Sequence, residues 1–259
     1  MLELTLFNLV LLIIISALLV FVKKTVKSVK MQNLLLLASA IITIIFHYST
    51  FIYLFVTGDG AYAYLLDNPN LILPIYPCNV VMWSCLILAL IKSDESKIKQ
   101  LLVDYSFWFG IFSTLVGMFA NVDFIMNPTF ADYDIVKSIV AHATLLFNVL
   151  LLSVFGRVRL DFLRNMKNIF ISVLGMYFIG LYCNLLFKVL VSDERAYDIN
   201  SMFIIHSPFE GLDFLTYPVI ALIGLLLYFV LFTVCELFKY KKGERWFDRV
   251  YSLLKKKKD

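Results

Sequence analysis

The stretch LPIYPCNVVMW, residues 73–83, places a thiol directly after two prolines at the start of a long apolar run. Proline is tolerated in the first turn of a helix, where its missing N–H would have no partner in any case. Whether Pro74 or Pro77 opens the helix, Cys78 then lies beside unpaired backbone N–H groups and the positive end of the helix dipole. That position favours a thiolate and supplies oxyanion donors, whereas apolar burial opposes ionisation. The pattern predicts a nucleophilic cysteine, provided that a base lies nearby.

Several other polar side chains are expected at the level of Cys78. His142, in a later apolar run, is expected at nearly the same depth and is the candidate base. Four further residues are candidate binding groups: Asn79, Asn184, His47 and His206. The carboxamide of Asn79 or Asn184, together with backbone N–H groups, could stabilise an oxyanion.

Structural interpretations of the same residues remain open. A free cysteine in a helix usually only packs, and a lone histidine is more often a hydrogen-bonded structural residue than a catalyst. A disulfide between Cys78 and Cys183 is a further alternative, because the exterior of a cell can be oxidising. No H-x₃-H, HExxH or paired CxxC spacing is present, so neither a metal site nor another cofactor is predicted.

The composition indicates a membrane protein. Of the 259 residues, 61% are hydrophobic and 16% are charged, against roughly half and a quarter in soluble domains. A membrane-spanning helix needs about 20 apolar residues to cross about 30 Å of hydrocarbon. Seven runs qualify: 4–22, 34–56, 72–92, 101–121, 136–156, 168–191 and 214–238. They predict an all-α polytopic membrane protein, a bundle of seven transmembrane helices over residues 1–238.

The positions of Lys and Arg predict the orientation of this bundle. All but three of the 23 basic residues lie in every second connection and in the tail: 23–33, 92–100, 157–167 and 239–259. The connections between them are mostly acidic. The alternation predicts an extracytoplasmic N-terminus and a cytoplasmic C-terminus for a multi-pass protein of the plasma membrane.

The tail, residues 239–259, has an apolar stripe at helical spacing and ends in a run of lysines. The stripe consists of Trp246, Phe247, Val250, Tyr251 and Leu254. A helix of this kind with basic residues on its other face is typical of binding to an anionic cytoplasmic leaflet. Membrane lipids are therefore the expected partners, and nothing indicates a nucleic-acid partner. The alternative is a solvated tail that only fixes topology.

The last outer connection contains a helix-capping pattern. Ser207, Pro208 and Glu210 stand at the spacing of an N-cap serine, a first-turn proline and a third-position glutamate. The last helix is therefore predicted to begin at Ser207 and to bend near Pro218. The apolar segment MFIIH before it is expected either to fold back over the outer opening as a lid or to rest on the membrane interface.

Five segments, in this order, resemble the YwaF-like integral membrane family, which includes transmembrane protein 164 of animals. They are LPIYPCNVV, FWFGIFSTLVG, AHATLLFNVLLL, GLYCNLLF and PFEGLDFLTYPVIA, spread over residues 70–235. The resemblance implies a fatty-acyl transferase acting on phospholipids, with Cys78 as the acyl carrier and His142 as the histidine of the fifth helix. Tyr76 and Asn79 stand where relatives have histidine, which leaves His142 or His47 as the base.

Two functions are therefore expected. The first is acyl transfer or lipid hydrolysis on phospholipid acyl esters in the outer leaflet, in which Cys78 attacks the ester and His142 takes and returns the proton. The second is non-enzymatic binding or transport of a small solute or lipid by the same polar residues. No predicted span carries an acidic residue near its middle, which argues against a proton-coupled pump.

Overall fold

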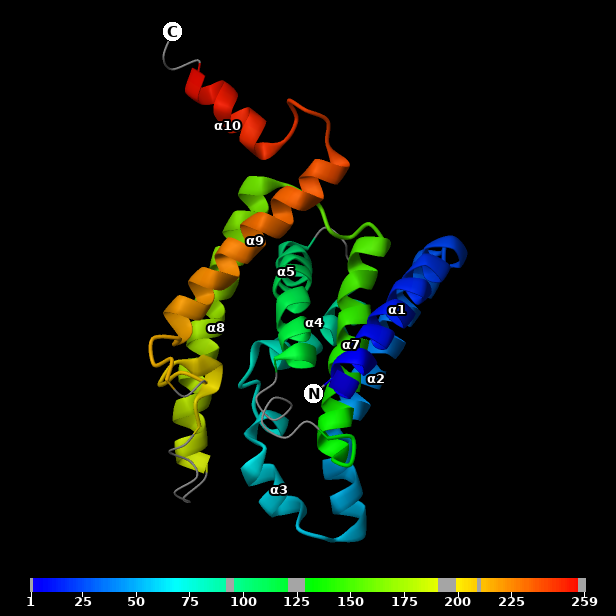
Figure 1. Cartoon of the computed structure of the whole chain (residues 1–259), viewed down its shortest axis with the longest axis vertical. Helices are drawn as coiled ribbons and strands as arrows, with labels where there is room; N and C mark the ends of the chain where they lie inside the picture. Colours follow the sequence, from blue (N-terminus) through cyan, green and yellow to red (C-terminus); the bar gives the residue numbers. More distant parts are fainter. Residues whose placement is uncertain (1, 92–95, 121–128, 191–198, 209–210, 256–259) are drawn as a thin grey trace.

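The computed structural model describes residues 2–91, 96–120, 129–190, 199–208 and 211–255, and every regular element in these ranges is helical (Figure 1). The long helices are α1 (Leu2–Thr25), α2 (Val29–Thr57), α5 (Lys97–Phe119), α7 (Tyr133–Val154), α8 (Phe162–Leu190) and α9 (Tyr217–Lys239). The shorter elements are α3 (Ala61–Asp67), α4 (Pro77–Leu90), α10 (Trp246–Lys255) and the 3₁₀ turns η1 (Pro69–Leu71) and η3 (Ser201–Phe203). The predicted all-α class is confirmed for this part of the chain.

A helix lies in each of the seven predicted runs, but one of them is short. Six described helices, of 22 to 29 residues, are long and apolar enough to cross a membrane. The run 72–92 instead forms α4, which has 14 residues and so is about 21 Å long, against a hydrocarbon core of about 30 Å. Pro77 is the first residue of α4, and residues 72–76 before it are not helical. The prolines therefore shorten this element.

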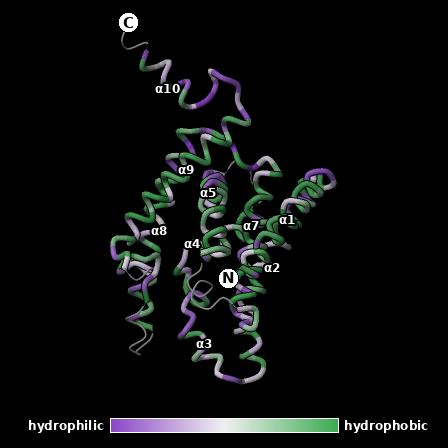
Figure 2. Tube along the Cα trace, in the orientation of Figure 1, coloured by the Kyte–Doolittle hydropathy of each residue, from purple (hydrophilic) through white to green (hydrophobic). Residues whose placement is uncertain are grey.

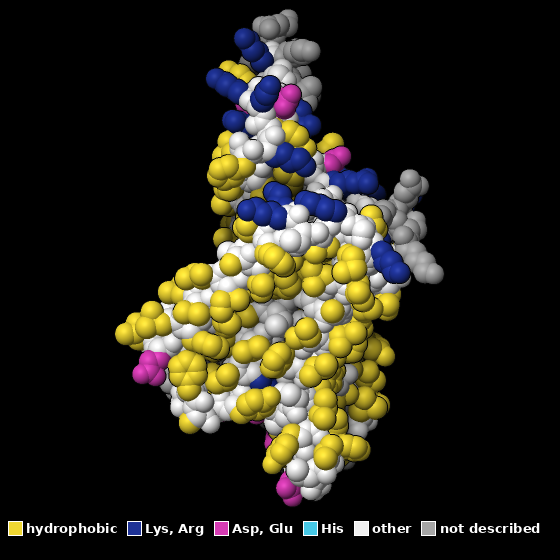
Figure 3. Space-filling view, turned by 90° about the vertical axis from the view of Figure 1, so that its right-hand side faces the viewer, with side chains coloured by type: hydrophobic (Ala, Val, Ile, Leu, Met, Phe, Trp, Pro, Cys, Tyr) yellow, Lys and Arg dark blue, Asp and Glu magenta, His cyan; other side chains and the backbone are white. Residues whose placement is uncertain are grey.

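The two ends of the bundle differ in charge. Figure 2 shows hydrophobic residues along the long helices and hydrophilic residues gathered near their ends. In Figure 3, Lys and Arg cluster towards one end of the molecule, and the hydrophobic side chains lie below them. We call this end, where α1 and α9 finish and α5 begins, the basic end. The other is the opposite end.

Helix α7 is the centre of the packing and contacts α1, α2, α4 and α5. Gly110 of α5 makes one of these approaches close, because a Cβ at this position would lie 2.7 Å from Val149 of α7 and 3.1 Å from Val81 of α4. The glycine therefore allows three helices to meet at one level. This level serves below as a reference for depth in the bundle.

The predicted start of the last helix at Ser207 is wrong. Helix α9 begins at Tyr217 with Thr216 as its N-cap, and Pro218 lies in its first turn. Proline fits there because its missing N–H would have no intrahelical partner. Gly211 has a left-handed backbone with φ of 77°, which is incompatible with a helix that continues from Ser207. Glu210, the third member of the predicted cap, lies outside the described residues.

The predicted tail helix is present as α10 and is attached to the bundle. The backbone N–H of Trp246 donates to Glu236 Oε2 (2.6 Å) and its indole N–H donates to Thr233 Oγ1 (3.0 Å). The indole stacks on Phe162 of α8, with ring centroids 4.8 Å apart. Trp246, the first residue of the predicted apolar stripe, therefore attaches α10 to the bundle. The later members of the stripe, Val250, Tyr251 and Leu254, are exposed.

Candidate functional site

Cys78 is the second residue of α4. Of the two predicted helix starts, the structure has the one at Pro77, with Tyr76 as N-cap. Pro77 has no N–H, and the backbone N–H of Asn79 donates to the Tyr76 carbonyl oxygen (3.1 Å). The backbone N–H of Cys78 is therefore the donor of this first turn that can hold a negatively charged sulfur or oxygen. The thiol is partly buried against the main apolar core.

Asn79 stabilises the start of α4. Its buried side chain accepts a hydrogen bond through Oδ1 from the backbone N–H of Tyr76 (3.1 Å). The oxygen therefore caps the helix. An oxyanion needs a donor, so only the amide nitrogen of Asn79 could take the predicted role of stabilising one.

Tyr105 of α5 is a neighbour of Cys78 that sequence reasoning missed. Its hydroxyl donates to the carbonyl oxygen of Pro77 (3.1 Å) and lies 3.2 Å from Met176 Sδ on α8. The phenol is also within electrostatic range of the Cys78 thiol and of the Tyr217 phenol. Nothing in the pattern around Tyr105 distinguishes it from a packing residue, since it occurs within an apolar run.

His142 is held between α7 and α5. Its Nδ1 lies 2.8 Å from the Ser138 carbonyl oxygen, one turn earlier. A carbonyl only accepts, so Nδ1 carries the proton and Nε2 is the basic nitrogen of the neutral ring. A Cβ at Gly117 of α5 would lie 2.2 Å from both Nε2 and Cδ2. The edge of the ring that would act as a base therefore lies against Gly117.

Cys78 and His142 lie at different distances along their helices from the level at Gly110. Cys78 precedes Val81 of α4 by three residues, and His142 precedes Val149 of α7 by seven residues. No hydrogen bond joins the thiol to the imidazole in the described part of the chain.

His47 of α2 contacts the chain before α4 and its own helix neighbour Tyr48. Its Nε2 is 3.3 Å from the Asn70 carbonyl oxygen, and its ring packs edge-on against Tyr48. The ring is within electrostatic range of His142 and of Lys137. Two of the three predicted histidines are therefore neighbours, on the side of the bundle formed by α2 and α7.

Asn184 of α8 and His206 both interact with the segment of residues 199–208. Asn184 Oδ1 accepts from the backbone N–H of Ser201 (2.8 Å), and its Nδ2 is buried without a hydrogen-bond partner among the described residues. His206 is exposed and interacts through Nδ1 with the side chain of Asn200 (3.1 Å). Asn184 therefore anchors the segment to α8, whereas His206 lies on the surface.

Only the start of the MFIIH segment folds back into the bundle: Met202 is buried, whereas Ile205 and His206 are exposed. Ile199, Ser201 and Met202 are buried. The backbone N–H of Met202 and the Ser201 hydroxyl both donate to the carbonyl oxygen of Ile75 (2.8 and 3.1 Å). Met202 also packs against Gly180 of α8, where a Cβ would lie 2.9 Å from it. The segment covers the chain three residues before Cys78.

A buried lysine at the opposite end was also missed. The Lys137 ammonium, on a side chain that is 10% exposed, lies 2.6 Å from Asp134 and donates to Thr50 Oγ1 and Tyr64 Oη, both at 2.7 Å. These contacts join α2, α3 and α7. The sequence signal was Asp134 one turn before Lys137, which together suggest an ion pair on one helix face.

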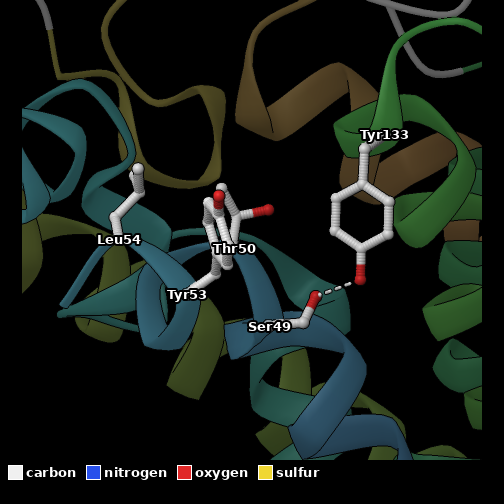
Figure 4. A pocket seen from close by; sticks show the side chains of 5 residues that line it. All are labelled: Ser49, Thr50, Tyr53, Leu54 and Tyr133. Atoms are coloured by element: carbon white, nitrogen blue, oxygen red, sulfur yellow. Dashed lines mark hydrogen bonds between the residues drawn. The ribbon is translucent and has the colours of Figure 1, made fainter. Parts of the chain in front are cut away.

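A pocket of about 480 Å³ adjoins this ion pair (Figure 4). Its lining residues come from α2 and the start of α7: Ser49, Thr50, Tyr53, Leu54 and Tyr133. The Tyr133 hydroxyl donates to Ser49 Oγ (2.9 Å) across it. Thr50 belongs both to the pocket wall and to the Lys137 contacts, so the pocket borders a buried charge.

A second buried charge lies towards the basic end. Asp104 of α5 is 0% exposed; it accepts from Asn168 (2.6 Å) and lies 3.7 Å from Arg164 Nε, both on α8. The Tyr228 phenol of α9 is within electrostatic range of Asp104 and Glu236. The predicted run began at residue 101, which placed Asp104 at a solvated edge. In the structure it is inside the bundle.

Neither a disulfide nor a metal site forms among the described residues. All four cysteines are free thiols, so the predicted alternative of a disulfide between Cys78 and Cys183 is not formed. Within the described residues, no group of three or more His, Cys, Asp or Glu side chains is arranged to hold a metal ion.

The fold and the buried polar groups together define an all-helical, multi-pass membrane protein. Comparison with protein families identifies the family of the chain. The TMEM164 family matches residues 2–236, which is most of the chain, and the protein belongs to that family. No match was found among curated proteins or among solved structures.

Proposed function

We propose that the protein is a membrane-embedded acyltransferase or lipid hydrolase that acts on phospholipid acyl esters through Cys78. The observation that carries this proposal is the position of the thiol in the first turn of α4, directly after Pro77 and beside the backbone N–H of Cys78. The thiolate sulfur attacks the ester carbonyl, and the acyl C–O bond breaks. The lysophospholipid leaves with the proton, and the acyl group remains as a thioester on Cys78. An acceptor hydroxyl or a water molecule then takes the acyl group and restores the thiol.

We assign proton transfer to His142, through Nε2. Because no direct hydrogen bond joins His142 to Cys78 among the described residues, the transfer calls for one bridging water. The donors for the oxyanion are the backbone N–H of Cys78 and, as a further candidate, the Asn79 amide nitrogen. Tyr105 fixes the Pro77 carbonyl and so holds the first turn in place.

A thioester test examines this proposal. The purified protein is incubated with phosphatidylcholine, and the acyl group is identified by intact-protein mass spectrometry and released with hydroxylamine. Wild type is expected to carry a hydroxylamine-sensitive acyl group that is absent from Cys78→Ala and reduced by about 10²-fold or more in rate in His142→Ala. Cys235→Ser, a thiol near the basic end, serves as the control and should behave as wild type. Equal acylation of Cys78→Ala and wild type would contradict the proposal.

A non-enzymatic lipid or solute binder is the second candidate. It is favoured by one observation, which is that the thiol and the imidazole are not hydrogen-bonded in the described structure. A binder would retain ligand when Cys78 becomes alanine and would form no thioester. The same experiment therefore separates the two functions.

We further propose that the protein crosses the plasma membrane seven times, with α4 and the non-helical residues 72–76 as one crossing. The N-terminus is then extracytoplasmic, the basic end cytoplasmic, and α10 lies on the anionic inner leaflet. The gathering of Lys and Arg at one end supports this orientation (Figure 3). The exposed side chains of Val250, Tyr251 and Leu254 supply the apolar contact for α10.

Introduced cysteines test orientation and tail together. A membrane-impermeant thiol reagent applied to intact cells should label Asn68→Cys and leave Ser252→Cys unlabelled, with the wild type as background. An environment-sensitive dye on Leu254→Cys, a position in the apolar stripe, should report an apolar setting in nanodiscs that contain anionic lipid, and lose it in high salt because screening weakens surface attraction. Labelling of Ser252→Cys from outside would reverse the orientation.

A further inference from the structure

The described outer segment closes the direct route to Cys78 from the opposite end. Met202 and Ser201 donate to the Ile75 carbonyl, and both side chains are buried. Met202 and Phe203 have left-handed backbones, with φ of 55° and 56°, which non-glycine residues adopt only where the surroundings enforce it. A large substrate would have to displace this tightly held segment in order to reach the thiol along the bundle axis.

A second hollow opens to the side of the bundle, between α8 and α9. It has a volume of about 460 Å³, and its walls include Val173, Tyr177, Tyr217, Ala221, Leu222 and Leu225. Both helices are long and apolar enough to span the membrane, so the hollow faces the hydrocarbon of the bilayer. Its lining is almost entirely apolar, apart from the two tyrosine hydroxyls.

The hollow, which we call the α8–α9 groove, reaches towards Cys78 through two tyrosines. Tyr217 lines the groove, and its hydroxyl donates to the Val173 carbonyl oxygen across it. The Tyr105 hydroxyl lies 3.2 Å from Sδ of Met176, the residue before Tyr177 of the groove wall, and donates to the carbonyl oxygen of Pro77, the residue before Cys78. The groove, which opens into the bilayer, is therefore connected to the first turn of α4 through Tyr105.

We propose that the α8–α9 groove binds one acyl chain of a phospholipid and brings its ester sideways from the bilayer to Cys78. This inference deepens the proposed acyl transfer and rests on it. An acyl chain matches the apolar walls, and its position in the hydrocarbon layer is the one that lipid chains already occupy. The hydroxyls of Tyr217 and Tyr105 lie at the end of the groove where the polar ester would arrive. Tyr217 positions the substrate there, and Tyr105 lies between the groove and the thiol.

A photoreactive lipid tests the groove independently of catalysis. Full-length protein is reconstituted with phosphatidylcholine that carries a diazirine in one acyl chain, illuminated, and mapped by peptide mass spectrometry. Cross-links in wild type should concentrate on α8 173–177 and α9 217–225. Ala221→Trp fills the groove and should lower these cross-links, and the rate of thioester formation on Cys78, at least 10-fold.

Val230→Trp is the matched control, because Val230 is an exposed residue of the same helix outside the groove. It should retain both signals. If Ala221→Trp does not purify as a folded protein, Ala221→Leu replaces it and should give a smaller loss in the same direction. Cross-links spread evenly over the exposed faces of α1, α2, α8 and α9 would overturn the groove proposal, even if Cys78 forms a thioester. Groove cross-links without any thioester would instead retain the chain-binding site and overturn the catalytic function.

Discussion

Replacement of Asp104 by alanine is expected to destabilise the protein by about 1–3 kcal/mol, because it leaves the Asn168 amide without its acceptor and removes the counter-ion of Arg164, whose side chain is 28% exposed. The Asp104 carboxylate is fully buried and is the acceptor for Asn168 and the counter-ion of Arg164. These contacts connect α5 to α8 at the basic end. The measurement is the midpoint of unfolding in detergent, followed by helical circular dichroism.

Two further variants show whether charge or packing causes the loss. Asp104→Asn keeps an oxygen for Asn168 and should cost less than Asp104→Ala. The double variant Asp104→Leu with Arg164→Met removes both charges together and should recover most of the stability, because a buried ion pair contributes little net energy relative to apolar packing. Asp59→Ala, at an exposed position, is the control. An Asp104→Ala midpoint equal to that of the control would refute the buried ionic contact.

Much of the fold could be predicted because apolar length and first-turn proline have direct physical consequences. Each apolar run contains a helix, and Pro77 begins α4 as the mechanism of proline at a helix start requires. The capping pattern at Ser207 failed because a local pattern does not show that Gly211 turns the chain before a helix can form. Pro218, expected to bend α9, starts it instead.

The site was predicted less completely, since depth and partners depend on tertiary packing. Counting residues from the ends of the apolar runs placed Cys78 and His142 at one level. In the structure Cys78 lies three residues before Val81 and His142 lies seven residues before Val149, the two residues that approach Gly110. Asn79 was expected to face a substrate, but half of its carboxamide caps α4. Lys137 and Asp104 lie near the ends of predicted runs, and only their packed neighbours reveal that both are buried.

Replacement of Gly117 by alanine should displace the His142 ring and destabilise the protein by about 1–3 kcal/mol, the usual cost of overpacking. The added Cβ would lie 2.2 Å from both Nε2 and Cδ2 of the imidazole. The ring cannot simply rotate away without loss, because Nδ1 donates to the Ser138 carbonyl oxygen. If His142 is the base, thioester formation on Cys78 should fall as well.

Gly175→Ala provides the matched control for this substitution. Gly175 is also inside a helix, but its Cβ would meet nothing within 4 Å, so alanine there should be neutral or stabilising by up to about 1 kcal/mol. The double variant Gly117→Ala with His142→Ala removes the ring that causes the clash. It should be more stable than the sum of the single changes predicts, by roughly 0.5–3 kcal/mol. Additive single effects would show that Gly117 does not make room for His142, and the assignment of Nε2 as the ring edge held against α5 would then be wrong.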